Sequence, residues 1–128
     1  MEKDDDKLIK GIHHVQITIP KGTEQAARVF YCEVLSLTEI EKPASLQGRG
    51  GFWIQVGDRE VHIGTEDGVK RNLTKAHIGY EVSDINEIKR ILIEQGVTIV
   101  ECVPIPGYER FEFRDPFDNR VECIQRVV

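Results

Sequence analysis

The sequence predicts an α+β domain in which a strand–helix–three-strand unit occurs twice. Two segments of polar–apolar alternation, at residues 12–19 and 76–82, are each followed by a helix with one apolar stripe and then by short strands. Helix and alternating strand mixed in this order are typical of α+β folds. The spacing repeats as well, since 63 residues separate His14 from His77 and 60 separate His62 from Glu122. We therefore expect the two halves to fold alike.

The totals suit one globular domain. The chain has 128 residues, 40% hydrophobic and 30% charged, which is enough for a real core. Its net charge of −5 argues against general nucleic-acid binding, which needs a basic face. No apolar run approaches the roughly 20 residues of a membrane span. The three cysteines, Cys32, Cys102 and Cys123, form no CxxC motif, which favours a reducing, cytoplasmic location.

The domain organisation follows from the polar segments. Residues 1–10, MEKDDDKLIK, are expected to form a flexible acidic tail, because they lack the apolar region of a signal peptide. The single domain then covers residues 11–128. Its modules are expected at about 11–66 and 75–127, with the turn-rich linker at about 67–74.

The first module begins with the strand that ends at Pro20, because proline cannot donate to a sheet hydrogen bond. Thr23 is expected to cap a helix over residues 24–35. Alternating strands at 51–56 and 60–64 follow. The apolar stripe of the helix contains Ala26, Ala27, Phe30, Val34 and Leu37.

The second module repeats this order after the strand at 76–82. Asp84, with Glu87 three residues later, predicts a capping box for a helix over residues 85–95. Gly96 lies where a helix end favours a left-handed residue. Three strands complete the module, at residues 97–103, 109–114 and 119–125.

Four good metal ligands lie at matching places of these strands, on the faces opposite the helix-covered core. They are His14, His62, His77 and Glu122. Imidazole and carboxylate together suit zinc, nickel, cobalt, manganese or ferrous iron. A single histidine is usually a solvated or hydrogen-bonded side chain, but matched positions in matched halves favour one shared site. His13 alternates to the apolar face and is expected to be a core histidine.

The chain resembles the vicinal oxygen chelate superfamily, which includes glyoxalases, fosfomycin- and bleomycin-resistance proteins and extradiol dioxygenases. The motifs that carry the resemblance are HHVQITIP, RVFYCEVLSL, KAHIGYEV and DPFDNRVECI, so it spans about residues 11–125. It implies two βαβββ modules that form a half-open, eight-stranded barrel-like cleft around one divalent ion. By strand order, the ligand places of this superfamily fall on the four residues above.

Two positions depart from the pattern of the superfamily, although neither touches the ligand set. Ser36 stands where relatives commonly have glycine, so it must take a positive φ at some cost or end the helix differently. Asp118 also stands where glycine is usual. Aspartate tolerates the left-handed region better than most residues, so this turn is expected to survive.

The leading hypothesis is a metal-dependent enzyme with lyase- or isomerase-type chemistry on a small substrate that chelates the ion through two oxygens. Glu122, or a metal-bound hydroxide, would move the proton. A thiol transferase, or a ring-cleaving dioxygenase if the ion is iron, stays open on the same fold. A metal-free drug-binding protein of the bleomycin-resistance kind is the alternative, although such relatives generally lack the ligand residues. A structural metal site ranks last, because such sites are typically cysteine-rich.

Substrate contacts are expected from four side chains, Arg49, Trp53, Tyr108 and Arg110. Arginine binds carboxylates and phosphates bidentately, although a surface ion pair explains either arginine equally well. The resemblance also implies a homodimer, in which one site uses modules from one chain or from two. No nucleic-acid or membrane partner is indicated.

Overall fold

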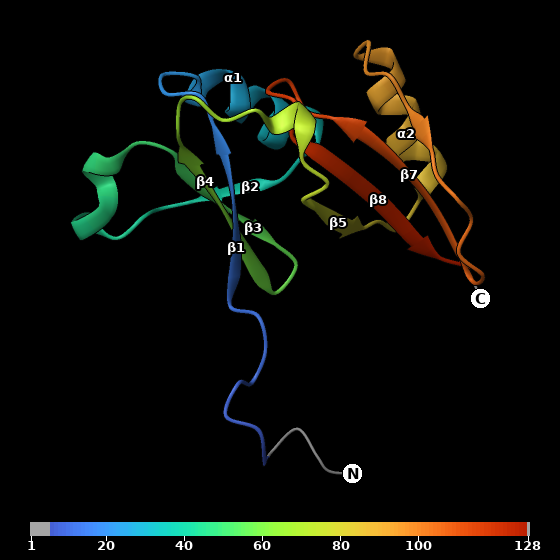
Figure 1. The fold of residues 1–128 in the computed structure, drawn as a ribbon, viewed down its shortest axis with the longest axis horizontal. Coiled ribbons are helices and arrows are strands. Elements are labelled where there is room, and N and C mark those ends of the chain that lie inside the picture. Colours follow the sequence, from blue (N-terminus) through green and yellow to red (C-terminus); the bar gives the residue numbers. More distant parts are fainter. Residues whose placement is uncertain (1–5, 128) are drawn as a thin grey trace.

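The computed structural model describes residues 6–127, so residues 1–5 of the expected acidic tail lie outside the described residues. The chain folds into two four-stranded sheets with few helices (Figure 1), as the alternating segments and amphipathic helices predict. The two sheets do not close into a barrel. Each sheet therefore keeps a polar face of its own beside a shared core.

The first sheet has the strand order β1-β4-β3-β2. Its strands are β1 (His14–Ile19), β2 (Thr38–Ile40), β3 (Phe52–Val56) and β4 (Arg59–Thr65). Strand β1 runs parallel to β4, and the other pairs are antiparallel. The register sets Gln16 beside His62 and His62 beside Trp53, so these side chains share one face.

The second sheet repeats this topology with the order β5-β8-β7-β6. Its strands are β5 (His77–Glu81), β6 (Val100–Glu101), β7 (Tyr108–Arg114) and β8 (Arg120–Arg126). The register sets Gly79 beside Glu122 and Glu122 beside Glu112. Glu122 thus occupies the place that His62 has in the first sheet. Strand β6 is much shorter than the strand expected over residues 97–103.

The helices are short apart from one. They are α1 (Glu24–Arg28), the π-helical segment η2 (Val29–Val34) that continues it, the 3₁₀ segments η3 (Ala44–Arg49) and η4 (Arg71–Leu73), and α2 (Ile85–Glu94). Figure 1 shows α2 lying along the second sheet and α1 near the junction between the two sheets.

The first helix differs from the expectation in two ways. Its geometry changes from α to π after Arg28, which alters the angular spacing of the side chains. Tyr31 is therefore fully buried, whereas Ala26 of the expected stripe is exposed. The expected helix cap by Thr23 is also wrong. The Thr23 hydroxyl donates to the Pro20 carbonyl at 2.6 Å and accepts no hydrogen bond from the N–H groups of the helix.

The second helix begins much as the sequence predicts. The Asp84 carboxylate accepts a hydrogen bond from the Glu87 amide at 3.1 Å. Only half of the capping box forms, because the Glu87 carboxylate pairs with Arg90 instead of reaching back. Ile85 and Leu92 are buried, and Gly96 ends the helix at a φ of 80°. The apolar stripe thus faces the sheet as expected.

The two glycine-like positions both adopt the left-handed region. Ser36 has a φ of 61° and Asp118 a φ of 73°. Asp118 lies in the turn between β7 and β8, where its amide donates to the Asp115 carbonyl at 3.0 Å. The turn therefore survives without glycine, as the sequence predicts.

One core continues through both modules. It contains Ile19, Ala27, Phe30, Tyr31, Phe52, Ile54, Val61, Ile63, Ile85, Leu92, Phe111, Phe113, Val121 and Cys123. The Tyr31 hydroxyl donates to Asp115 at 2.6 Å, and the Asn119 amide donates to the Thr18 carbonyl at 3.0 Å. These two bonds tie the first module to the turn between β7 and β8.

His13 lies outside this core, so the expectation of a core histidine is wrong. Its side chain is exposed, and its Nδ1 is 3.1 Å from the Nδ1 of His14. The strand begins only at His14, so the alternation that would have turned His13 inward does not reach it.

Candidate metal centre

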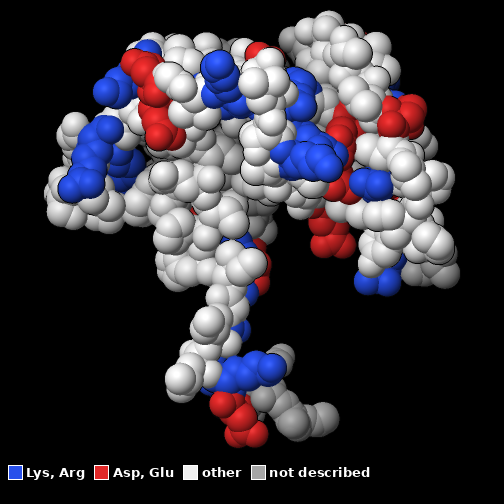
Figure 2. Space-filling model, viewed as in Figure 1, with Lys and Arg blue, Asp and Glu red and all other residues white. Residues whose placement is uncertain are grey.

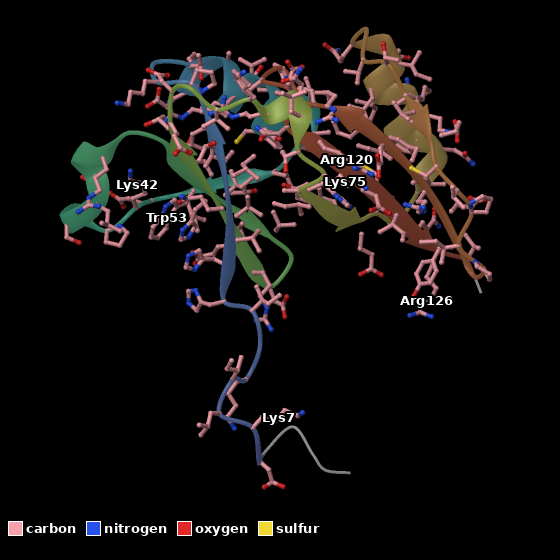
Figure 3. All side chains as sticks on the ribbon, viewed as in Figure 1. Lys7, Lys42, Trp53, Lys75, Arg120 and Arg126 are labelled. Atoms are coloured by element: carbon pink, nitrogen blue, oxygen red, sulfur yellow. The ribbon has the colours of Figure 1, made fainter. Side chains whose placement is uncertain are left out.

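The candidate site residues divide between the two sheets. Figure 2 shows basic and acidic side chains side by side over the second sheet. In Figure 3, Trp53 lies on the first sheet, whereas Arg120 lies on the second. The four ligands expected from the sequence divide in the same way, with His14 and His62 on one sheet and His77 and Glu122 on the other.

Three potential metal ligands meet on the second sheet. His77 of β5, Glu122 of β8 and Glu112 of β7 each offer a ligand atom, and these atoms lie within 4.8 Å of one another. Alternation places all three on the face opposite the core residues Val121 and Phe113. Within residues 6–127 this is the one such group of three, and neither His14 nor His62 belongs to it.

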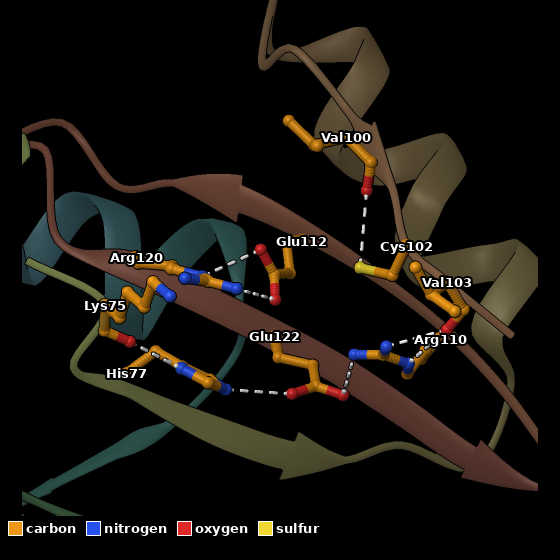
Figure 4. Close-up of polar contacts among 9 residues, drawn as sticks. All are labelled: Lys75, His77, Val100, Cys102, Val103, Arg110, Glu112, Arg120 and Glu122. Carbon is orange, nitrogen blue, oxygen red and sulfur yellow. Dashed lines mark hydrogen bonds and ion pairs between the residues drawn. The ribbon is translucent and has the colours of Figure 1, made fainter. Parts of the chain in front are cut away.

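The His77 ring is oriented by a hydrogen bond to a backbone carbonyl two residues earlier in the chain (Figure 4). Its Nδ1 is 2.9 Å from the Lys75 carbonyl, and its Nε2 is 3.0 Å from Glu122 Oε1. A carbonyl can only accept, so Nδ1 carries the proton, and in the neutral ring Nε2 then presents a lone pair to a carboxylate oxygen. Two lone pairs at this distance require a cation between or beside them, either a proton or a metal ion. A ligating histidine in proteins is commonly held by such a carbonyl.

Two arginines hold the carboxylates. Arg110 Nη1 is 3.2 Å from Glu122 Oε2, which leaves Oε1 directed at His77. Arg120 binds Glu112 through two hydrogen bonds of 2.8 and 2.7 Å. These bonds lower the pKa of Glu112 below its ordinary value, so this carboxylate is a fixed anion. Because Arg120 occupies both Glu112 oxygens, Glu122 is the better placed of the two ligands.

Arg110 forms an ion pair with a glutamate, which is the alternative to a substrate contact that the sequence left open. Besides pairing with Glu122, it donates from Nε and Nη2 to the Val103 carbonyl at 3.1 and 2.7 Å. Its side chain is only 18% exposed. Glu112 is not among the predicted ligands, although the alternation of ERFEFR places it on the same face as Glu122.

The ligands of the first sheet form a stack of rings. The His62 ring lies 3.7 Å from Trp53 at an interplanar angle of 1°, and 4.0 Å from His14 at 16°. Its Nε2 is 2.9 Å from Glu60 Oε1. Metal–nitrogen bonds lie near the plane of an imidazole ring, so two parallel rings this far apart cannot bind one ion together. His62 is 6% exposed, whereas His14 is exposed, which makes His14 the available ligand of the pair.

The other expected substrate residues line two separate cavities. Arg49 and Trp53 border a cavity of about 370 Å³ beside His62. Tyr108 and Arg110 border one of about 280 Å³ that is lined also by α2 residues Ile85, Asn86 and Lys89 and by none of the three potential metal ligands. A larger cavity of about 590 Å³ lies between α1, η2 and the end of α2, and none of the candidate site residues lines it. No helix within the described residues is long and apolar enough to cross a membrane.

Comparison with known proteins shows the family and the fold of the chain. The model of the Glyoxalase/Bleomycin resistance protein/Dioxygenase superfamily matches residues 11–123. A solved glyoxalase family protein from Bacillus anthracis is 40% identical, with a TM-score of 0.88, over 94% of this chain and 98% of that one. No curated protein matches the chain at a significant level.

More distant structures share the fold. A glyoxalase/dioxygenase from Nostoc punctiforme is 19% identical, with a TM-score of 0.76, over 93% of this chain and 92% of that one. The fosfomycin resistance protein FosX from Listeria monocytogenes, solved with Mn(II) and sulfate ion, is 16% identical, with a TM-score of 0.73, over 94% of both chains.

Proposed function

Because the chain belongs to the glyoxalase/bleomycin resistance protein/dioxygenase superfamily, we propose that it is a metal-dependent enzyme with lyase- or isomerase-type chemistry on a small, oxygen-chelating substrate. The observation that carries the proposal is the His77–Glu122 pair. Its Nε2 and Oε1 atoms are 3.0 Å apart and both present lone pairs when the imidazole is neutral. The Mn(II) in FosX supports a divalent ion in this fold.

The ion would be held by His77 and Glu122 of one chain and completed by His14. Gly79 pairs with Glu122, and a Cβ on it would lie in ordinary van der Waals contact with Glu122 Oε1, at 3.6 Å. His14 does not join the group within its own chain. We therefore assign the third ligand to His14 of a second copy in a homodimer, and we give His62 a packing role between Trp53 and His14.

The roles of the remaining residues follow from their contacts. A divalent ion in such a site supplies Lewis acidity that stabilises negative charge on a bound substrate oxygen. Arg110 holds Oε2 of Glu122, so the carboxylate keeps one orientation. Glu122 is the group placed to accept and return a substrate proton, because Arg120 fixes Glu112 at both of its oxygens.

Metal analysis of protein purified without chelator tests the proposal. We expect about one divalent ion per chain in the wild type and loss of the ion in His77→Ala and Glu122→Gln. His14→Ala should also weaken binding and yield subunits that no longer share a site. A wild-type protein that takes up none of zinc, nickel, cobalt, manganese or iron while keeping its fold would refute the proposal.

Mixed dimers separate a shared site from a site within one chain. His14→Ala and His77→Ala proteins, combined and reassociated, should recover binding in one of the two sites of a heterodimer. Failure to recover any binding in a verified heterodimer would place all ligands in one chain and contradict the assignment of His14.

A further inference from the structure

The cavity beside the ring stack of the first sheet has the opposite charge to the chain as a whole. It is lined by Gln16, Lys42, Arg49, Trp53, His62 and Thr65, together with glycine and aliphatic residues. It therefore carries two cationic side chains, and among residues 6–127 no carboxylate lines it. The chain has a net charge of −5, so this local excess of positive charge is not a property of the average surface.

The two cations lack acidic partners. Lys42 donates from Nζ to the Gly50 carbonyl at 2.7 Å, and in the part of the chain that the structure describes neither Lys42 nor Arg49 forms an ion pair. Arg110, by contrast, is committed to Glu122. The guanidinium of Arg49 thus keeps its full set of donors for a ligand.

The loop that carries these cations is fixed by its glycines. Gly50 and Gly51 both have positive φ, at 76° and 78°. A Cβ on Gly51 would lie 2.1 Å from the Ile63 carbonyl oxygen, so only glycine allows the chain to approach β4 this closely. The Gly51 amide also donates to the Glu24 carboxylate at 3.0 Å. Together with the Lys42–Gly50 bond, these contacts close the loop over residues 42–51 beside Trp53.

We infer that this cavity binds an anionic group of the substrate, a carboxylate, phosphate or phosphonate, through Arg49 and Lys42. A volume of about 370 Å³ suits part of a small molecule. Trp53 and His62 form one wall, and the stack continues from His62 to His14. Figure 3 shows Lys42 and Trp53 next to each other, and Figure 2 shows basic side chains over this loop. The inference rests on the proposed function in one respect. It assumes that the bound anionic group belongs to the same substrate whose oxygens bind the metal ion near His14.

Trp53 provides the measurement, because it is the single tryptophan of the chain and lines the cavity. Inorganic phosphate, sulfate and acetate are titrated into metal-free protein while tryptophan emission is recorded, and calorimetry provides a second readout. We expect saturable binding that weakens as ionic strength rises, because Arg49 is exposed and Lys42 is only half-buried. The order of the three anions distinguishes a carboxylate subsite from a tetrahedral-oxyanion subsite.

Matched variants identify the residues involved. Arg49→Gln should weaken phosphate binding about fivefold, since an exposed charge pair contributes little more. Arg49→Lys should retain most of it, and the double variant with Lys42→Gln should show no saturable binding. Lys7→Gln removes one positive charge in a different part of the molecule and should bind as the wild type does (Figure 3). Circular dichroism verifies that each variant is folded.

The outcomes separate this inference from the proposed function. Equal binding by the wild type and the double variant would mean an adventitious ion only and would overturn the inference. An absence of anion binding in a protein that still binds its divalent ion would overturn it as well and leave the metal site standing. Arginine-dependent phosphate binding in a protein that takes up no ion would sustain the subsite and refute the metal-dependent enzyme.

Discussion

The two modules have the same strand topology but carry different side chains at equivalent positions. Where the second sheet places His77 and Glu122, the first sheet places His14 and His62 at the equivalent strand positions. His77 and Glu122 meet through a ring nitrogen and a carboxylate oxygen 3.0 Å apart, whereas the rings of His14 and His62 stack face to face at 4.0 Å. Equivalent backbone positions therefore do not give equivalent sites, because the neighbouring side chain decides how each ring turns.

The neighbour on the third strand makes this difference. Trp53 covers one face of His62, while the equivalent position of the second sheet carries Glu112, which Arg120 holds aside. An aromatic neighbour orders a histidine by stacking, whereas a carboxylate neighbour leaves the ring edge free. The second module thus provides potential metal-ligand atoms. The first module provides the stacked rings of Trp53 and His62 and the cationic loop over residues 42–51.

The sharpest test of this comparison replaces the equivalent residues Glu122 and His62. We expect Glu122→Gln to weaken divalent-ion binding by more than the roughly 100-fold that loss of a supporting residue produces. His62→Gln should weaken it by no more than about 10- to 100-fold, the range for a residue that only supports a ligand. Calorimetric titration with Mn²⁺ measures both. Equal losses would mean that the two sheets contribute ligands symmetrically.

The next test compares two glycines of positive φ, one from each module. Gly51→Ala should destabilise the fold by about 3 kcal/mol or more, because a Cβ would meet the Ile63 carbonyl oxygen at 2.1 Å. Gly96→Ala has a similar φ of 80° but no atom within 4 Å of its Cβ, so it should cost only about 1 kcal/mol. Urea unfolding monitored by circular dichroism gives both values. Losses of similar size would show that the loop over residues 42–51 is not constrained by close approach.

A smaller effect should separate the buried hydroxyls of Tyr31 and Tyr80. Tyr31 donates to Asp115 at 2.6 Å, so Tyr31→Phe should cost about 1–3 kcal/mol by leaving that carboxylate short of a donor. The Tyr80 hydroxyl is buried and has no hydrogen-bond partner among the described residues, so Tyr80→Phe should be neutral or slightly stabilising. Thermal unfolding measures the difference. A destabilising Tyr80→Phe would reveal a partner for that hydroxyl.

A still smaller difference between Tyr31 and Tyr80 should be seen in how the free energy of unfolding changes at alkaline pH. Burial first, and then the Asp115 charge, raise the pKa of Tyr31 well above its ordinary value of 10.0. Burial likewise raises the pKa of Tyr80. A pKa that is raised in the folded state gives stability that is present below about pH 10 and lost as the pH rises further, because the unfolded chain releases the proton first. Above pH 10, the free energy of unfolding should therefore fall less steeply with pH for Tyr31→Phe than for the wild type. Identical slopes would contradict this.

Much of the fold could be predicted because its signals are local. The strands at His14–Ile19 and His77–Glu81 follow from alternation, and the start of α2 follows from Asp84. The π-helical segment η2 and the burial of Tyr31 could not be predicted in this way. They depend on Phe30 and Tyr31 packing against the second module, where Phe113 and Asp115 lie.

The candidate site was only partly open to prediction. The sequence could mark His77 and Glu122, since register and alternation carry them to one face. It could not show that Arg110 pairs with Glu122, because a surface ion pair and a substrate contact look alike in a string of residues. Nor could it show that Trp53 lies over His62, since stacking depends on rotamers chosen by the neighbouring strands.

By itself, the sequence determined the two repeated modules and the faces on which the ligand residues lie, because a period-2 strand and a capped amphipathic helix are local consequences of residue order. Only the tertiary structure decided which of those residues meet. The two sheets stay open, so His14 and His62 remain apart from the group formed by His77, Glu112 and Glu122. The physical reason is that a strand fixes where a side chain points, whereas a coordination group needs atoms from separate strands within a few ångströms, and only packing sets that distance.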